Sequence, residues 1–146
     1  MQFRVQNLTV HKFGGASVKD ADAVRNVESI LQKCLVSPAV VVVSAMGKTT
    51  NKLEQVFSTL VSDGFDKSLE ELNEIVVAHQ KVIDALSIEL DLRELFVTAL
   101  KNSSQLDDIN AAYDELVASG EDASTKILFA YLDSNSWDVE WRDVRD

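Results

Sequence analysis

The chain has 146 residues, of which 46% are hydrophobic, and a formal net charge of -10 at pH 7. This length predicts one globular unit with a real core, and the negative charge argues against a general affinity for nucleic acid or anionic membranes. Cys34 is the only cysteine, which excludes an intrachain disulfide and a cysteine metal cluster and favours a reducing, cytoplasmic setting. Residues 1–10 lack the apolar run of a signal peptide, and the apolar stretch 39–43 is too short to span a bilayer.

The first predicted element is a strand over residues 8–13, which are rich in strand formers and stop at Gly14 and Gly15. Ser17 or Asp20 can then cap an amphipathic helix. Its apolar positions recur at spacings of three and four: Ala23, Val24, Val27, Ile30, Leu31 and Cys34. The sequence therefore predicts a strand followed by a helix.

A second strand is predicted at residues 39–43, directly after Pro38. Its unbroken Ala-Val-Val-Val-Val run is typical of a parallel strand that is buried on both faces, and it completes a right-handed βαβ unit. Residues 44–51 then form a loop that leads into a second helix. The apolar stripe of this helix consists of Leu53, Val56, Phe57, Leu60 and Val61.

The pattern stays helical over residues 67–132, with breaks predicted at Asp91, at 102–104 and at 119–120. Large and acidic residues alternate over 137–141, which predicts a short strand with Trp137 and Trp141 facing the core. Charged residues follow without a closing element. The sequence therefore looks cut rather than finished.

The first loop has the chemistry to bind a phosphate group. Gly14 and Gly15 let the backbone approach a ligand, the following helix contributes partial positive charge, and Lys12 adds a full charge. Such a set stabilises charge that shifts during phosphoryl transfer. Taken alone, Lys-x-Gly-Gly is more often an ordinary strand-to-helix turn.

The second loop offers short hydrogen-bonding groups to a small substrate. It is not a P-loop, because Val42 occupies the place of the upstream glycine before Gly47-Lys48-Thr49. The polar groups around the glycine suit the carboxylate of a small polar substrate, with helix capping as the alternative role. These groups belong to Ser44, Thr49, Thr50 and Asn51.

The third segment of interest is 119–125, where acidic residues fall in the first turn of a helix. Acids at that position ordinarily complement the helix dipole. Glu121 could instead pair with the ammonium group of a substrate, a charge-assisted contact that contributes about 1.5–3 kcal/mol.

Together, three motifs resemble the aspartate kinase branch of the amino acid kinase family: Lys12-Phe-Gly-Gly-Ala-Ser17, the loop 42–51 and the segment 119–124. The resemblance implies the N-terminal half of a three-layer α/β/α fold with a mainly parallel sheet and a large helical insertion. Ala16 departs from the family, which usually has Thr there, but the departure spares the lysine and both glycines.

The resemblance also implies the roles of individual residues. Lys12 would contact the transferring phosphate, the nucleotide phosphate site would be lined by Gly14, Gly15 and Ser17, and aspartate would be bound by Thr50 and Glu121 with Ser44 nearby. Family members transfer the ATP γ-phosphate to the side-chain carboxylate of L-aspartate, which opens the route to lysine, threonine and methionine. They use Mg²⁺, held mainly through nucleotide phosphates, so no protein metal ligands are expected, and a homodimer is a possible assembly.

The family also uses an arginine, an aspartate and nucleotide-binding loops that we do not find before Asp146, so we expect this chain alone to lack kinase activity. Two alternatives stay open: another amino acid kinase, such as a carbamate, acetylglutamate or glutamate kinase, and a non-catalytic chain that keeps the fold for assembly or regulation. His11 and His79 are too few for a zinc site and are assigned packing or surface roles.

Overall fold

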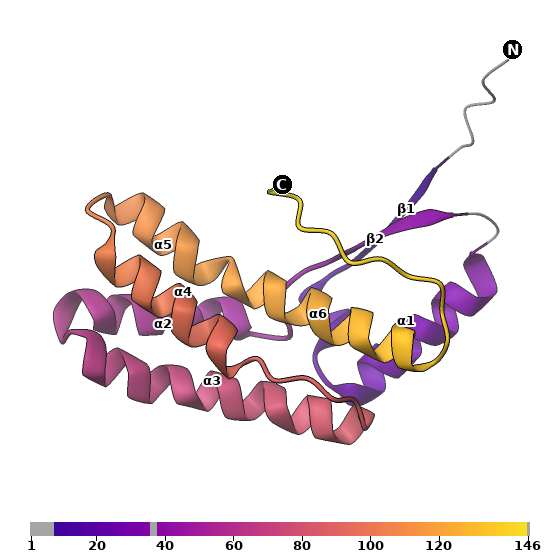
Figure 1. The fold of residues 1–146 in the computed structure, drawn as a ribbon, viewed down its shortest axis with the longest axis horizontal. Helices are drawn as coiled ribbons and strands as arrows, with labels where there is room; N and C mark the ends of the chain where they lie inside the picture. Colours follow the sequence, from indigo (N-terminus) through magenta and orange to yellow (C-terminus); the bar gives the residue numbers. More distant parts are fainter. Residues whose placement is uncertain (1–7, 36–37, 146) are drawn as a thin grey trace, which may run out of the picture.

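The computed structural model describes residues 8–35 and 38–145, which form an α/β unit with a helical part attached to a small sheet (Figure 1). In chain order the elements are β1 (Thr9–Phe13), the 3-10 helix η1 (Gly15–Val18), α1 (Ala21–Cys34), β2 (Ala39–Val43), α2 (Thr49–Ser62), α3 (Phe65–Leu86), α4 (Arg93–Gln105), α5 (Ile109–Val117) and α6 (Ser119–Ser134).

The predicted strand, helix and strand at the start of the chain are confirmed. β1 and β2 pair in parallel, in a register that runs from Thr9 opposite Ala39 to Phe13 opposite Val43. Parallel pairing needs a crossover connection, and α1 supplies it. Of the two predicted caps, Asp20 holds the position: its Oδ1 accepts a 2.8 Å hydrogen bond from the backbone N–H of Ala23.

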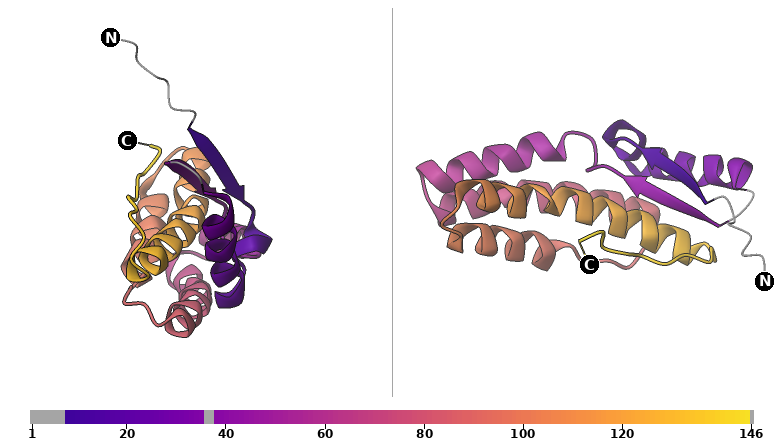
Figure 2. Two further views of the ribbon diagram at one scale, coloured as in Figure 1. Left: turned by 90° about the vertical axis from the view of Figure 1, so that its right-hand side faces the viewer. Right: turned by 90° about the horizontal axis from the view of Figure 1, so that it is seen from above.

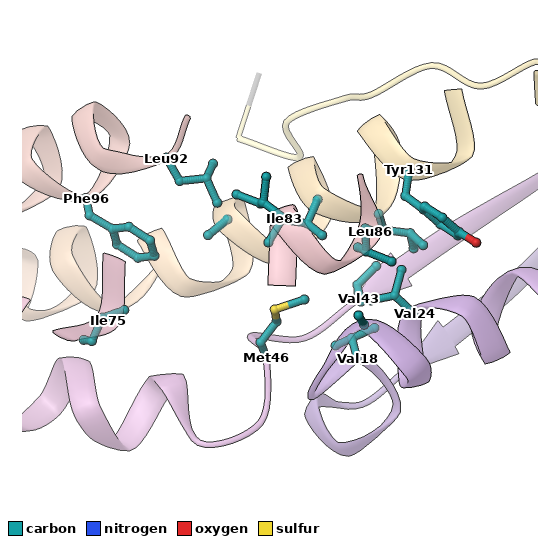
Figure 3. Close-up of a cluster of buried hydrophobic side chains, with 14 of the residues drawn as sticks. Val18, Val24, Val43, Met46, Ile75, Ile83, Leu86, Leu92, Phe96 and Tyr131 are labelled. Atoms are coloured by element: carbon teal, nitrogen blue, oxygen red, sulfur yellow. The ribbon is translucent and has the colours of Figure 1, made fainter. Parts of the chain in front are cut away.

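One face of the sheet is covered by helices and the other is open. Figure 3 shows Val43 beside Val18 and Val24 from the η1–α1 segment, with Leu86 of α3 and Tyr131 of α6 close by. These side chains are buried and belong to one continuous core. The core also extends into the helical part of the molecule, through residues that include Ile75, Leu92 and Phe96.

The opposite face carries Val10, Val40 and Val42, which are 60%, 42% and 42% exposed. Because side chains alternate along a strand, Lys12 shares this open face, directly across from Val42 in the register. The prediction that 39–43 is buried on both faces is therefore wrong for the described part of the chain. Its β-branched residues do form the strand, but the helices pack against one side of it.

The helical layer extends away from the sheet as two hairpins, α2–α3 and α4–α5, and α6 returns toward the sheet (Figures 1 and 2). The predicted breaks near Asp91 and Ser119 are confirmed, whereas the predicted break at 102–104 is wrong. Those residues belong to α4, and the chain turns at 106–108 instead. The reason is a cap: Asp108 Oδ1 accepts 2.9 Å hydrogen bonds from the N–H groups of Asn110 and Ala111, which starts α5.

The predicted strand at 137–141 is also wrong, since this stretch makes no strand pairing within the described residues. It runs back along α6 as an extended segment, fixed by its two indoles. Trp137 Nε1 donates to Glu28 at 2.9 Å, and Trp141 Nε1 donates to Thr125 at 3.0 Å. The alternating pattern thus reflects packing on helices, and both tryptophans are half-buried.

Among the helices of residues 8–35 and 38–145, none combines the length and the apolar character that crossing a membrane requires.

Candidate functional site

The loops that follow β1 and β2 lie side by side, as expected for parallel neighbours. The N–H of Ser44 donates to the carbonyl of Phe13 at 3.0 Å, and the N–H of Gly47 donates to the carbonyl of Gly15 at 2.9 Å. The two loops predicted to bind phosphate and substrate are therefore joined backbone to backbone. Ligands of open α/β sheets bind at this carboxyl edge.

The two glycines of the first loop have different roles. A Cβ atom on Gly15 would lie 2.6 Å from the carbonyl oxygen of Ala45 and 3.0 Å from that of Gly47, so only glycine lets the loops approach this closely. Gly14 is exposed and has no heavy atom within 4 Å of an added Cβ. Gly47 has a φ of 52°, in the left-handed region that favours glycine. The structure thus leaves Gly14 as the glycine with open space beside it.

Lys12 and Ser17 flank this pair of glycines. The Lys12 side chain is exposed on the open face of the sheet, and within the described ranges it takes part in no ion pair. Ser17 is exposed in η1, and its N–H donates to the carbonyl of Gly14 at 2.9 Å. Lysine, glycine and serine therefore line the accessible side of the first loop.

The first turn of α6 packs onto the second loop, which brings the third predicted segment to the same place. The Ser124 hydroxyl donates to the carbonyl of Ser44 at 2.7 Å. A Cβ on Gly120 would lie 3.0 Å from the Cβ of Ala45 and 3.3 Å from Cγ2 of Thr49, so the helix and the loop are in tight contact. Segments about 80 and 110 residues apart are thus assembled around one edge of the sheet.

The predicted substrate residues sit on the rim of this junction. Ser44 and Thr50 are half-buried, and Glu121 is exposed. α2 begins after Lys48 with no side-chain capping bond, so the alternative role of its serine and threonine residues as caps is not observed there. The N–H of Thr49, the first residue of α2, donates to the carbonyl of Met46 at 2.9 Å, so the N–H groups that this turn can offer a ligand are those of Thr50 and Asn51.

The neighbouring acid, Asp122, is neutralised by a residue that sequence analysis did not single out. Arg145 contacts Asp122 at 2.7 Å and also pairs with Asp143, whose pKa falls to about 2 because of the hydrogen bonds from the guanidinium. The Glu121 carboxylate accepts no side-chain hydrogen bond and joins no ion pair among the described residues. Only the fold could reveal the Arg145 contact, since 23 residues separate the partners.

His79 lies beneath the second loop, on α3. It is 3% exposed, its Nδ1 donates to the carbonyl of Ile75 at 2.8 Å, and its ring meets Phe96 edge-on. Burial lowers the pKa of this imidazole, the hydrogen bond to Ile75 partly opposes that shift, and the charge of Lys52 lowers it further. The prediction of a packing role for His79 is confirmed. Residues 8–35 and 38–145 contain no group of three or more His, Cys, Asp and Glu side chains that could hold a metal ion.

Comparison with known proteins gives one consistent result. A model of the amino acid kinase family matches residues 7–146. Aspartokinase 2, chloroplastic, of Arabidopsis thaliana is 35% identical over 130 residues, which cover 84% of this chain and 24% of that protein. The lysine-sensitive aspartokinase 3 of Escherichia coli (strain K12) is 28% identical over 145 residues, covering 97% and 32%.

Among solved structures, E. coli aspartokinase III in complex with aspartate and ADP (R-state) superimposes with a TM-score of 0.77 at 29% identity. The match covers 95% of this chain and 32% of that one. The E. coli aspartokinase III complex with lysine and aspartate (T-state) gives a TM-score of 0.74 at 27% identity. This chain therefore spans about a quarter to a third of the length of these relatives.

Proposed function

Because this chain belongs to the amino acid kinase family, we propose that it forms the aspartate-binding and phosphate-binding wall of an aspartate kinase. The reaction is transfer of the ATP γ-phosphate to the side-chain carboxylate of L-aspartate, which gives 4-phospho-L-aspartate, the first step toward lysine, threonine and methionine. The observation that carries the proposal is the junction of the three motif segments at the carboxyl edge of the sheet.

The first loop is proposed to hold the phosphate groups. Lys12 supplies a mobile, exposed positive charge for the transferring phosphate, while Gly14 and Ser17 line the approach to it. Gly15 belongs to the same site in a different way: its contact with the Ala45 carbonyl fixes the height of the first loop relative to the second. A positive charge that is already in position before the reaction stabilises the transition state, because the site does not have to reorganise during the reaction.

The second and third segments are proposed to hold the amino acid. Glu121 carries a negative charge at the rim of the junction and would pair with the substrate ammonium. Ser44 and Thr50 offer hydroxyl groups on the loop side of the junction, and the first turn of α2 adds the N–H groups of Thr50 and Asn51 for a carboxylate. An aspartate molecule supplies both kinds of partner.

The chain's own part in catalysis is positioning and charge neutralisation. The aspartate carboxylate is itself the nucleophile, so no protein nucleophile is needed. Mg²⁺ would be carried mainly by the nucleotide phosphates, in keeping with a donor set here of lysine, hydroxyl and backbone N–H groups, which are poor metal ligands. In support, the similar E. coli aspartokinase III has been solved in complex with aspartate and ADP.

We further propose that the chain alone does not turn over ATP. Within residues 8–35 and 38–145, no layer covers the face of the sheet that carries Lys12, Val10, Val40 and Val42, whereas a parallel sheet ordinarily has both faces covered. The plant aspartokinase 2 and the E. coli aspartokinase 3 are about four and three times as long as the segment that each shares with this chain. Association as a homodimer and a cytoplasmic setting complete the proposal.

The test combines binding and turnover on the purified chain. Calorimetric titration should detect binding of L-aspartate to the chain. An assay that traps acyl phosphate with hydroxylamine should detect no product when the chain is supplied with aspartate and Mg-ATP. A folded chain that binds neither aspartate nor Mg-ATP would instead support a non-catalytic role in assembly or regulation. Turnover at a normal rate would refute the claim that this wall is insufficient by itself.

A further inference from the structure

The Ser124 side chain is the polar link between two parts of the proposed amino acid site. It is 1% exposed, and its Oγ lies 2.7 Å from the carbonyl oxygen of Ser44 and 3.1 Å from that of Glu121. A hydroxyl has one hydrogen to donate, and the shorter bond goes to Ser44 across 80 positions of sequence. One buried side chain therefore contacts the backbone of two of the three residues that are proposed to bind substrate, Ser44 and Glu121.

Ser124 differs in this respect from two other hydroxyl residues of α6, Thr125 and Ser134. Thr125 donates to the carbonyl of Asp122 at 2.9 Å, and Ser134 donates to that of Tyr131 at 2.7 Å, so both bond back to their own helix. Of these three hydroxyls, only that of Ser124 donates to a residue outside α6, although the Thr125 hydroxyl also accepts from Trp141. The bond from Ser124 to Ser44 therefore does more than satisfy a helical hydroxyl.

The reach of Ser124 depends on the small residue one turn before it. A Cβ on Gly120 would come within 3.1 Å of Leu53 Cδ1, besides its contact at 3.0 Å with Ala45. Because position 120 has no side chain, α6 can approach the second loop closely enough for the hydroxyl to bond. Gly120 sets the distance, and Ser124 fixes the register of the helix on the loop.

We propose that Ser124 is a positioning residue that locks the first turn of α6 to the loop after β2 and so holds Glu121 at a fixed offset from Ser44. The inference rests on the proposed function, in which an α-amino acid must touch both sides of this junction at once. Loss of the lock lets Glu121 and Ser44 move independently, and a ligand that bridges them then has to restore their spacing when it binds.

The experiment compares Ser124→Ala with Ser134→Ala, which removes the same kind of hydroxyl from the far end of the same helix. We expect Ser124→Ala to weaken L-aspartate binding by about three- to tenfold, the equivalent of one net hydrogen bond, and Ser134→Ala to leave it unchanged. Ser124→Cys keeps a weak donor, so its dissociation constant for L-aspartate should lie between those of Ser124→Ala and the native chain. Equal dissociation constants for Ser124→Ala and Ser134→Ala would overturn the proposal.

Amide hydrogen exchange separates this proposal from the proposed function. Ser124→Ala should speed exchange at the N–H groups of Ser44 and Gly47, which are bonded to the first loop in the native chain, and Ser134→Ala should not. If the native chain binds no aspartate, the proposed function fails. The exchange rates of the two variants then still show whether Ser124 holds the loop in place. Identical exchange in both variants would show that Ser124 does not hold the loop.

Discussion

The N–H of Gly47 donates a 2.9 Å hydrogen bond to the carbonyl of Gly15, and this bond joins the loops after the two strands. Gly15 tolerates the bond because it has no Cβ, and Gly47 tolerates it because its φ is 52°. The phosphate side and the amino acid side of the proposed site are thereby built as one unit. Their relative position depends on two glycines, Gly15 and Gly47.

Gly15→Ala should disrupt this unit. Its Cβ would meet two carbonyl oxygens of the second loop, at 2.6 and 3.0 Å, and backbone cannot move aside as a flexible side chain can. We expect the free energy of unfolding to fall by about 1–3 kcal/mol, as in other overpacked sites, with loss of aspartate binding. Urea unfolding and calorimetric titration measure the two effects.

The neighbouring Gly14→Ala is the matched control. The same methyl group has nothing within 4 Å there, and the φ of -75° suits any residue. The free energy of unfolding of Gly14→Ala should stay within about 0.5 kcal/mol of that of the native chain. If both alanine variants lost the same stability, the close approach of the two loops would not be what requires Gly15.

Glu28→Gln should loosen the attachment of the C-terminal segment. The Glu28 carboxylate accepts hydrogen bonds from Trp137, Tyr131 and Asn135, which connect α1 to α6 and to the segment after it. Partial burial acts to raise the pKa of this carboxyl, but the three hydrogen bonds outweigh it and the pKa is lowered from 4.5. We expect a loss of about 1 kcal/mol at pH 7, measured by urea unfolding.

The pH dependence of this loss follows from the sign of the shift. Because the folded pKa is lowered, the stabilisation is present above pH 4.5 and disappears as the pH falls through the folded value. Native chain and Glu28→Gln should therefore converge in stability at acid pH. Asp22→Asn, which changes an exposed acid on the same helix, is the control and should differ little from the native chain at any pH.

His79→Gln should change how the free energy of unfolding responds to mild acid. Burial, opposed by the Ile75 hydrogen bond and aided by the Lys52 charge, lowers the folded pKa of His79 below 6.5. The unfolded chain then binds the proton more readily, so native stability is complete above pH 6.5 and is lost as the pH falls toward the folded pKa. The variant should lack this slope in urea unfolding between pH 7.5 and 5.5. Parallel slopes for the two chains would exclude His79 as the cause.

Much of the fold was predictable from local signals. β1 and β2 follow from β-branched runs that end at glycines or polar loops, and α1 follows from its apolar spacing and from the Asp20 cap. The α/β amino acid kinase fold is confirmed by the family match and by the superposition on aspartokinase III. These features are local, or belong to the family as a whole.

Two of the errors arise where polar groups find hydrogen-bond partners, in another segment or in their own helix, that the sequence pattern does not reveal. The alternation at 137–141 resembles a strand, but its indoles bond to Glu28 and Thr125 on helices. The polar triplet at 102–104 resembles a break, yet Ser103 and Ser104 donate to the carbonyls of Ala112 and Lys101 at 2.6 Å and stay helical. In neither place does the sequence reveal which partner a polar group will find.

The site was predictable in outline and not in detail. The rule that ligands bind at the carboxyl ends of parallel strands placed both loops together, and the structure joins them. The different roles of Gly14 and Gly15, and the bond from Ser124 to Ser44, depend on distances between segments that are remote in sequence. The binding roles of Lys12, Gly14, Gly15, Ser17, Ser44, Thr50 and Glu121 stay predictions.

The most direct test of the central claim is an NMR titration of the labelled chain with L-aspartate, with succinate as a matched ligand that lacks the ammonium group. We predict saturable shifts at the amides of 44–50 and 121–124, none in the distant turn 106–108, and a weaker effect of succinate. Glu121→Gln should weaken aspartate binding while leaving succinate binding unchanged. Absence of saturable shifts at both segments, or equal binding of the two ligands, would contradict an aspartate site at this junction.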